Sequence, residues 1–198
     1  METLILGGSV VAWAGLHSWL ASSQAKEAAR ARFGGLADRF YRLTYNVISA
    51  VTLAPIAWLM RVLPDGQVYA VSAACAPVLA AGRVLALVLL LLTLLQTAPL
   101  HFAGISQVLA RNSPSRMVTA GFYGVVRHPL YLFGLFVLWL SPSMTSNQLT
   151  VSVVLTAYLF IGALLEERRL LLEFGKEYET YRSSTPMILP RLRLRRDK

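Results

Sequence analysis

One long apolar run, "RVLALVLLLLTLLQTAP" (residues 83–99), decides the class of fold. A helix that crosses a membrane needs about 20 mostly apolar residues, and this run approaches that length. Followed outward in both directions, the chain holds four further segments of this kind: 3–21, 43–63, 129–142 and 148–166. The stretch "VYAVSAACAPVLAAG" (68–82) is also apolar but contains Pro77. It is compatible with a re-entrant piece, a sixth partial span or an extension of the 83–99 helix.

The composition also indicates an integral membrane protein. Apolar residues make up 56% of the chain and charged residues 15%, against roughly 45–50% and about 25% in soluble domains. The net charge of +9 would suit a nucleic-acid-binding protein. However, the basic residues lie between the apolar runs and at the C-terminus, where membrane topology places them. We therefore expect a lipid bilayer, and no nucleic acid, as the partner.

The basic residues also predict an orientation. Of the nineteen Lys and Arg residues, all but Arg61 and Arg83 lie in the connections 22–42 and 100–128 or after residue 166. With five spans, these three segments share one side of the membrane, and the positive-inside rule makes that side cytoplasmic. We expect a protein of the bacterial inner membrane with its N-terminus outside and its C-terminus in the cytoplasm.

The predicted fold is therefore an all-α, polytopic integral membrane helix bundle with about five transmembrane helices. The basic, amphipathic segment "SSQAKEAARARFGGLADRFYRL" (22–43) predicts an interfacial helix on the headgroup surface, and a further cytoplasmic helix follows the last span. No linker divides the chain, so we expect a single domain over 1–198, with N-terminal spans in 1–99 and the polar motifs in 100–190.

Common nucleotide and metal motifs are absent from the sequence. It contains no GxGxxG or GxxxxGK[ST] pattern, so we expect no Rossmann-type or P-loop nucleotide site. The histidines lie far apart, and the single Cys75 excludes an intramolecular disulfide and a thiolate-rich metal site. We expect no metal centre.

The first group of polar residues near the membrane is "GFYGVVRHPLY" (121–131). Proline suits the first turn of a helix, so Pro129 predicts a helix start whose N–H groups attract anions. Arg127 and His128 add a cation and a titratable donor beside it, with the aromatic faces of Tyr123 and Tyr131 nearby. Two interpretations fit this stretch equally well. It could form a pocket for a carboxylate and an aromatic or cationic ligand, or it could be a snorkelling arginine within an aromatic belt at the membrane interface.

The second group is "LLEERRLLLEFGKEYETYR" (164–182). Glu166 and Glu167 fall where the last span leaves the membrane, so they should pair or face a cavity. Arg168 and Arg169 are candidate local partners. Taken alone, the segment fits a charged cap on a cytoplasmic helix better than a binding site.

Together these segments resemble the membrane methyltransferase superfamily that includes isoprenylcysteine carboxyl methyltransferase. Its elements RHPxY and EExxL…FGxxYxxY occur intact and in order. Within it the chain is most similar to the bacterial methanethiol S-methyltransferase group, through "HFAGISQV" (101–108), "SPSMT" (141–145) and "TPMILP" (185–190). "LHSWLAS" (16–22) is similar to the first span of that group and of the membrane family associated with nitric oxide reductase. Ala103 and Ser106 depart from the group's pattern.

The resemblance implies S-adenosylmethionine (SAM) as the methyl donor and places the catalytic half at 100–190, with Arg127 and Glu167 as the catalytic residues. Independently of the resemblance, a histidine inside a span is a functional candidate, so His17 and the nearby Trp13 are expected to touch substrate, and a hydrogen bond between helices explains His17 equally well. The implied cofactor-binding residues are Gln107, Tyr123, Val126, Arg127, His128, Pro129, Tyr131, Glu166, Glu167, Tyr178 and Tyr181.

The expected function is methyl transfer to a small or membrane-soluble thiol. Two alternatives stay open. One is methylation of a prenylated-cysteine carboxylate or a lipid amine, and the other is a non-enzymatic assembly factor on the same scaffold.

Overall fold

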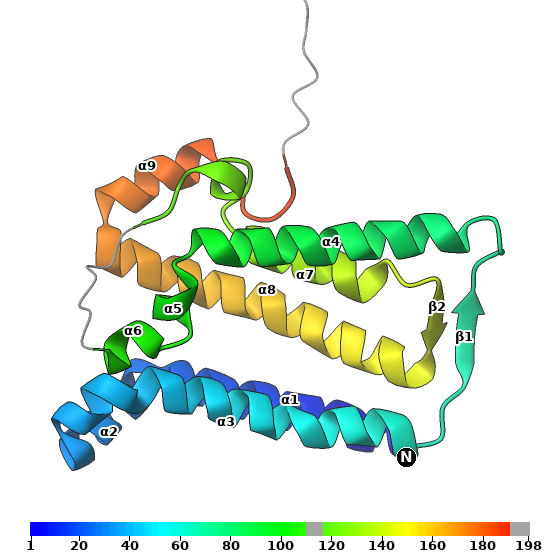
Figure 1. Cartoon of the computed structure of the whole chain (residues 1–198), viewed down its shortest axis with the longest axis horizontal. Helices are drawn as coiled ribbons and strands as arrows, with labels where there is room; N and C mark the ends of the chain where they lie inside the picture. Colours follow the sequence, from blue (N-terminus) through cyan, green and yellow to red (C-terminus); the bar gives the residue numbers. More distant parts are fainter. Residues whose placement is uncertain (110–116, 191–198) are drawn as a thin grey trace, which may run out of the picture.

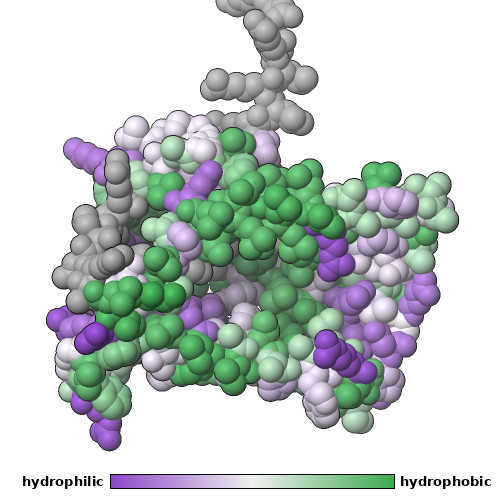
Figure 2. Space-filling model, in the orientation of Figure 1, coloured by the Kyte–Doolittle hydropathy of each residue, from purple (hydrophilic) through white to green (hydrophobic). Residues whose placement is uncertain are grey.

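Four helices of the computed structural model are long and apolar enough to cross a membrane. The structure describes residues 1–109 and 117–190. The four helices are α1 (Glu2–Ala21), α3 (Gly35–Val62), α4 (Ala76–Gln96) and α8 (Ser146–Phe174). Apolar side chains are exposed along all four helices, and Figure 2 shows them covering the broad face of α4. Exposure of this extent suits a lipid environment and indicates an integral membrane protein.

The predicted span 129–142 is a much shorter helix, α7 (Pro129–Trp139). Its 11 residues extend only about 16 Å, roughly half of the hydrocarbon thickness. The helix ends early because Pro142 disfavours helical geometry in the residue before it. The chain then continues as the strand β2 (Ser143–Thr145), which crosses the end of the bundle roughly at right angles to the helices (Figure 1).

The apolar stretch 68–82 is neither a sixth span nor a re-entrant piece. Its first part forms β1 (Gln67–Ala70), which pairs antiparallel with β2. The remainder extends the helix predicted at 83–99, because α4 already begins at Ala76 with Pro77 in its first turn. The small two-stranded ribbon is an addition to the all-α fold that was expected.

The remaining helices gather at the other end of the bundle. They are α2 (Ser23–Phe33), α5 (Pro99–Phe102), α6 (Ile105–Val108), the 3₁₀ helix η1 (Gly121–Gly124) and α9 (Lys176–Ser184). Figure 1 shows the N-terminus at the end that carries β1 and β2, which we call the ribbon end. The opposite end carries the basic connections and is called the basic end. The four long helices and the shorter α7 alternate in direction (Figure 1), and helices α2 and α9 occupy the predicted interfacial and C-terminal positions.

Helix α8 joins the two halves of the bundle. On one side Leu6 and Val10 of α1 and Ile56 of α3 form a buried cluster against the ribbon-end half of α8. On the other side Leu132 and Phe133 of α7 pack around Ala163 of α8. Because residues of α8 belong to or pack against both buried clusters, this helix lies between the two halves of the bundle.

Two glycines allow the turns at the basic end. Gly175, at φ +52°, separates α8 from α9 and lets α9 turn back over the bundle. Gly104, at φ +88°, lies so close to α3 that a Cβ would stand 2.5 Å from the Leu43 nitrogen. Any larger residue at this position would push α6 away from α3.

Candidate functional site

A buried ion pair between Arg127 and Glu167 lies at the centre of the candidate site. Arg127 precedes α7, and Glu167 lies in the last two turns of α8. The Arg127 Nε and Nη2 atoms donate to Glu167 Oε1 at 2.7 and 2.5 Å. The two side chains are only 8% and 6% exposed. Charges this deeply buried are stable only when they are paired, so each residue requires the other.

Helix α9 and the residues after it supply further hydrogen-bond acceptors to Arg127. The Arg127 Nη1 atom donates to the Arg182 carbonyl at 3.0 Å and also to the Thr185 carbonyl. The backbone N–H of Arg127 donates to the Pro186 carbonyl at 2.8 Å. With these bonds the guanidinium donates to Glu167 and to two backbone carbonyls of the chain's C-terminal part.

Glu167 also collects further donors. Arg182 Nε lies 3.4 Å from Oε2, and His128 Nε2 lies 3.3 Å from Oε1. The local partners suggested by the sequence, Arg168 and Arg169, do not form these ion pairs. Side chains one or two positions apart on a helix point in different directions, which explains why residues from other segments take their place.

Glu166 is the more open of the two carboxylates, with its side chain 38% exposed. Tyr131 donates its hydroxyl proton to Glu166 Oε2 at 2.8 Å, and His128 Nδ1 lies 3.7 Å from the same oxygen. The His128 and Tyr131 rings stack with centroids 5.2 Å apart. Burial lowers the pKa of His128, and the two neighbouring glutamates oppose that shift.

Three tyrosines of the basic end lie around this pair of carboxylates. The Tyr181 hydroxyl donates to the Tyr123 carbonyl at 2.6 Å, which ties α9 to η1. Burial, followed by the charge of Glu166, raises the pKa of the Tyr123 phenol. Burial raises the pKa of Tyr181 to about 12. All three phenols, including that of Tyr178, therefore stay neutral at physiological pH.

Tyr178 stands out among these residues. Its side chain is 1% exposed, and its hydroxyl lies beside the Arg127 guanidinium without hydrogen-bond geometry to any described residue. Burial and the nearby Glu167 raise its pKa. Its ring meets that of Tyr181 edge-on at 6.0 Å, so it supports the site mainly through packing.

Two further residues implied by the resemblance, Val126 and Gln107, have different surroundings. Val126 is 1% exposed and packs in the core with Phe133 and Ile188. Gln107 lies in α6, which packs on α3, whereas the cluster belongs to α7, α8 and α9 (Figure 1). Pro129 begins α7, as expected, and is buried.

A second polar cluster lies among the spans, around His17 of α1. The Tyr45 hydroxyl lies 2.7 Å from His17 Nε2, and the Ser49 hydroxyl oxygen lies 2.9 Å from Nδ1. Because Ser49 donates its own proton to the Tyr45 carbonyl, its oxygen accepts from Nδ1–H. This pattern places a proton on Nδ1 of His17, and the apolar surroundings favour the neutral ring, in which Nε2 accepts from the Tyr45 hydroxyl.

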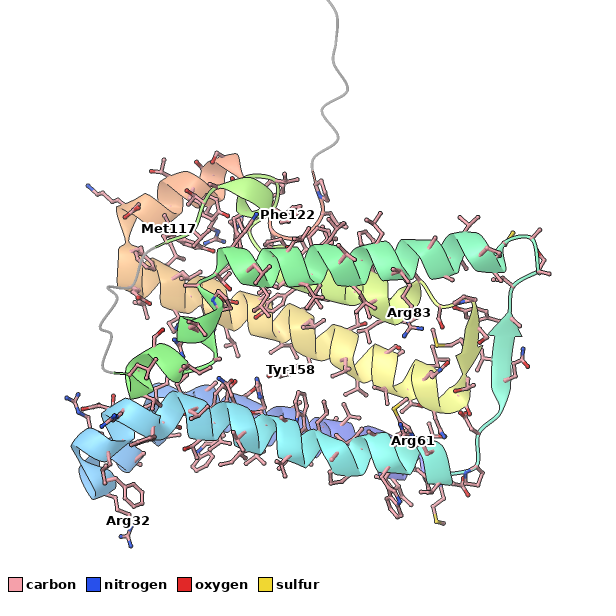
Figure 3. The ribbon with its side chains drawn as sticks, in the orientation of Figure 1. Arg32, Arg61, Arg83, Met117, Phe122 and Tyr158 are labelled. Atoms are coloured by element: carbon pink, nitrogen blue, oxygen red, sulfur yellow. The ribbon has the colours of Figure 1, made fainter. Side chains whose placement is uncertain are left out.

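Aromatic residues enclose this His17 cluster. Trp13 stacks on the His17 ring at 5.1 Å and donates its indole N–H to the Ser49 carbonyl at 3.0 Å. Tyr158 of α8 meets both rings edge-on, at 6.0 and 6.1 Å. Figure 3 shows Tyr158 in the opening between α8 and the α1–α3 pair.

Sequence reasoning missed several of these contributors. Arg182 and Thr185 lie inside motifs that the resemblance used, but no local signal showed that they would meet Arg127. Tyr45, Ser49 and Tyr158 recur at helical spacing within apolar spans, and polar residues inside spans are themselves candidates. Within residues 1–109 and 117–190, no group of three His, Cys, Asp or Glu side chains is arranged to hold a metal ion.

The larger cavity does not lie at either cluster. It has a volume of about 360 Å³ and is lined mainly by apolar residues of α1, α2 and α3, among them Leu20, Phe33 and Phe40. Tyr45 both lines this cavity and belongs to the His17 cluster. The Arg127–Glu167 cluster is instead a partly open surface, with Glu166 as its exposed carboxylate.

Comparisons with known proteins agree with the resemblance. The chain is 32% identical over 158 residues to "Methanethiol S-methyltransferase" of Pseudomonas deceptionensis, an alignment of 77% of this chain and 60% of the relative. It is 30% identical over 161 residues to a protein of the same name in Mycobacterium tuberculosis, covering 75% and 63%. A 74-residue match to "Methanethiol S-methyltransferase 2" of Bradyrhizobium diazoefficiens is 45% identical and covers 37% and 29%.

The chain therefore spans less than two thirds of the length of the relatives it matches. No solved structure matches the chain significantly. The NnrU protein family matches residues 3–187, from the first span through the segment that closes over Arg127. Because this match covers nearly the whole sequence and both polar clusters, the chain belongs to the NnrU protein family.

Proposed function

We propose that the protein is an integral membrane methyltransferase that transfers a methyl group from SAM to a small or membrane-soluble thiol. One observation carries the proposal: the RHPxY and EExxL segments meet in space, as Arg127 pairs with Glu167 and Tyr131 with Glu166. Relatives named as methanethiol S-methyltransferases match most of the chain. These names imply a methyl donor and a thiol acceptor.

The residues around Glu166 match the chemical groups of SAM. SAM carries an ammonium and a sulfonium, which suit an exposed carboxylate and the faces of Tyr131 and Tyr123. Its carboxylate suits the N-terminus of α7, whose first turn begins at Pro129. SAM supplies an electrophilic methyl group on its sulfonium. Arg127 and Glu167 act as positioning residues in this proposal, because their polar atoms are engaged with each other.

The position of this set along α8 supports a reaction at the membrane surface. Glu166 lies 20 residues after the first residue of α8, Ser146, which corresponds to about 30 Å of helix and to the thickness of the hydrocarbon core. The same end carries the basic connections, so we propose that the site faces the cytoplasm of a bacterium, where SAM is made.

The His17 cluster is proposed as the acceptor side. Tyr158 lies eight residues before Glu166 on α8, or about 12 Å deeper in the membrane. Trp13, His17 and Tyr158 form a neutral surface with hydrogen-bonding groups, which suits an uncharged thiol arriving from the lipid. The thiol must lose its proton before it attacks the methyl group, because the thiolate is the nucleophile.

Transfer of tritium from methyl-labelled SAM tests the proposal with the full chain in lipid nanodiscs. The acceptors are methanethiol, a prenylated cysteine and phosphatidylethanolamine, each supplied separately. We expect a labelled thioether, and loss of at least about 100-fold of the rate in Glu166→Gln, because an exposed carboxylate partner of a cation is removed.

Each other result has a defined meaning. Label in the prenylated cysteine or the lipid, and none in the thiol, would replace the thiol by that acceptor. SAM binding by calorimetry without transfer to any acceptor would contradict the enzymatic proposal. The exposed Glu177→Gln variant on α9 serves as the matched control and should keep the full rate.

A further inference from the structure

A second cavity lies at the ribbon end, far from the Arg127–Glu167 pair. It has a volume of about 140 Å³ and lies where α3, α4, α7 and α8 approach one another. Its polar wall consists of Arg83, Ser141, Gln148 and Ser152, and Met60 and Met144 contribute to its apolar wall. The proposed methyl transfer uses none of these residues.

Arg83 is an unusual residue for a spanning helix. It lies seven residues after Ala76, the first residue of α4, or about 10 Å along the helix. The Arg83 Nη1 atom donates to Ser141 Oγ at 3.3 Å, and the Ser141 hydroxyl in turn donates a hydrogen bond to the Ser143 carbonyl at 2.6 Å. A charged residue at such a depth is costly without an ionic partner.

No carboxylate pairs with Arg83 in the part of the chain that the structure describes. Two acidic residues lie at this end, and both are engaged elsewhere. Asp65 accepts from the Ser146 hydroxyl and the Asn147 N–H, each at 2.9 Å. Glu2 pairs with the terminal ammonium at 3.5 Å.

A second cation faces the same opening. Arg61 lies in the last turn of α3, and Figure 3 shows it across the opening from Arg83 of α4. Figure 2 shows a hollow in this face of the molecule with apolar residues on both banks. Gln148 Oε1 accepts from the Thr145 N–H, so the side-chain amide nitrogen is left as a further donor to the cavity.

We propose that this cavity binds the phosphate of a membrane phospholipid headgroup. A guanidinium matches phosphate geometry with two parallel hydrogen bonds, and Gln148 and Arg61 add a donor and a second positive charge. The cavity suits a phosphate and not a whole lipid. The acyl chains of the lipid lie along the apolar banks of the hollow, within the leaflet at the ribbon end.

The bound lipid would fix the position of the ribbon. Arg83 joins α4 to Ser141, which lies just before the start of β2 at Ser143. An anion bound to Arg83 keeps that side chain at the cavity. We therefore expect the lipid to stabilise the protein without changing the cofactor site.

Native mass spectrometry of the full chain, purified in a neutral detergent, tests this proposal. The probes are phosphatidylglycerol, a galactolipid with the same acyl chains but no phosphate, and inorganic phosphate. We expect one phosphatidylglycerol adduct and a raised melting temperature, and neither with the galactolipid. Arg83→Gln should weaken the adduct about tenfold or more, because charged hydrogen bonds are lost. The exposed Arg32→Gln on α2 is the matched control and should bind as the wild type does.

The remaining outcomes separate the sources of phosphate and guard against misfolding. Stabilisation by inorganic phosphate alone, abolished in Arg83→Gln, would keep the anion site and overturn the lipid assignment. An unchanged adduct in Arg83→Gln, or an equal adduct with the galactolipid, would overturn the site itself. If Arg83→Gln does not fold, the exposed Arg61→Gln takes its place, and unchanged binding in that variant would contradict the two-cation site.

Discussion

The Arg127–Glu167 cluster and the His17 cluster both include residues of the central helix α8, Glu167 and Tyr158, yet they bury their polar groups differently. At the basic end, a guanidinium and a carboxylate neutralise each other at 2.5–2.7 Å. Deeper among the spans, His17 is kept uncharged between the hydroxyls of Tyr45 and Ser49. The difference follows from depth, since charge is tolerated near the membrane surface and is costly in the hydrocarbon. The polarity of the two clusters also suits a charged cofactor at one and a neutral acceptor at the other.

Glu167→Gln should give the largest effect, because it leaves the Arg127 charge buried without its partner. We expect a loss of about 3 kcal/mol in the free energy of unfolding, together with loss of SAM binding. Denaturation in detergent, followed by circular dichroism, measures the first and calorimetry the second. A variant with wild-type stability would show that the pair is not the main support of the site. Glu177→Gln on the exposed face of α9 is the control.

His17→Phe separates the two clusters by function. The ring size is roughly kept while both hydrogen bonds are removed, so the KM for the thiol acceptor should rise about tenfold, equivalent to one or two lost hydrogen bonds. The Kd for SAM should stay unchanged because the cofactor site lies at the other cluster. Steady-state kinetics and calorimetry on the same preparation measure both. Equal weakening of SAM binding would mean that the clusters act as one site.

The pH dependence of stability should come partly from His128. Since burial lowers the pKa of this residue in the folded protein, the unfolded chain binds its proton first as the pH falls. Stability is therefore complete above the ordinary pKa of about 6.5 and decreases below it, by at most about 1.4 kcal/mol per pH unit. Melting curves should be measured between about pH 8 and about pH 5.5, where histidine titrates. Over this range the melting temperature should fall more steeply for the wild type than for His128→Gln. Parallel curves would contradict the assignment.

Tyr178→Phe should have the smallest effect. The hydroxyl is buried without a hydrogen-bond partner among the described residues, so its removal relieves a desolvation cost and keeps the ring packing. We expect a change within about 0.5 kcal/mol, neutral or stabilising. A loss of more than about 1 kcal/mol in the same denaturation experiment would show that the hydroxyl contributes a bond to Arg127.

The long helices were predictable from the sequence because apolar length alone determines a span. The same reasoning overestimated the 129–142 span, where Pro142 ends α7 and the chain enters β2. The ribbon itself was not predictable, since its strands are three or four residues long and lie more than 70 residues apart in the chain. Short strands of this kind form only because α4, α7 and α8 bring them together.

The candidate site was predictable as a location but not as a set of contacts. The motifs placed Arg127 and Glu167 at one end of the bundle, whereas their pairing depends on the packing of α7 against α8. Sequence reasoning gave Glu167 the local partners Arg168 and Arg169, although helix geometry directs those side chains elsewhere. Gln107 and Val126 were carried over from the resemblance. Val126 packs in the core beside Tyr131 and Gln107 lies in α6, and their part in the site stays a prediction.

The closure of Arg127 by the segment after α9 also sets an order of biosynthesis. The Arg127 and His128 amides bond to the carbonyls of Pro186 and Met187, residues made about 60 positions later by the ribosome. By then the residues of α7 and α8 have already been synthesised. The Arg127–Glu167 cluster therefore cannot be completed until residues 185–187 have been made, and a nascent protein that stops short of them lacks these backbone bonds.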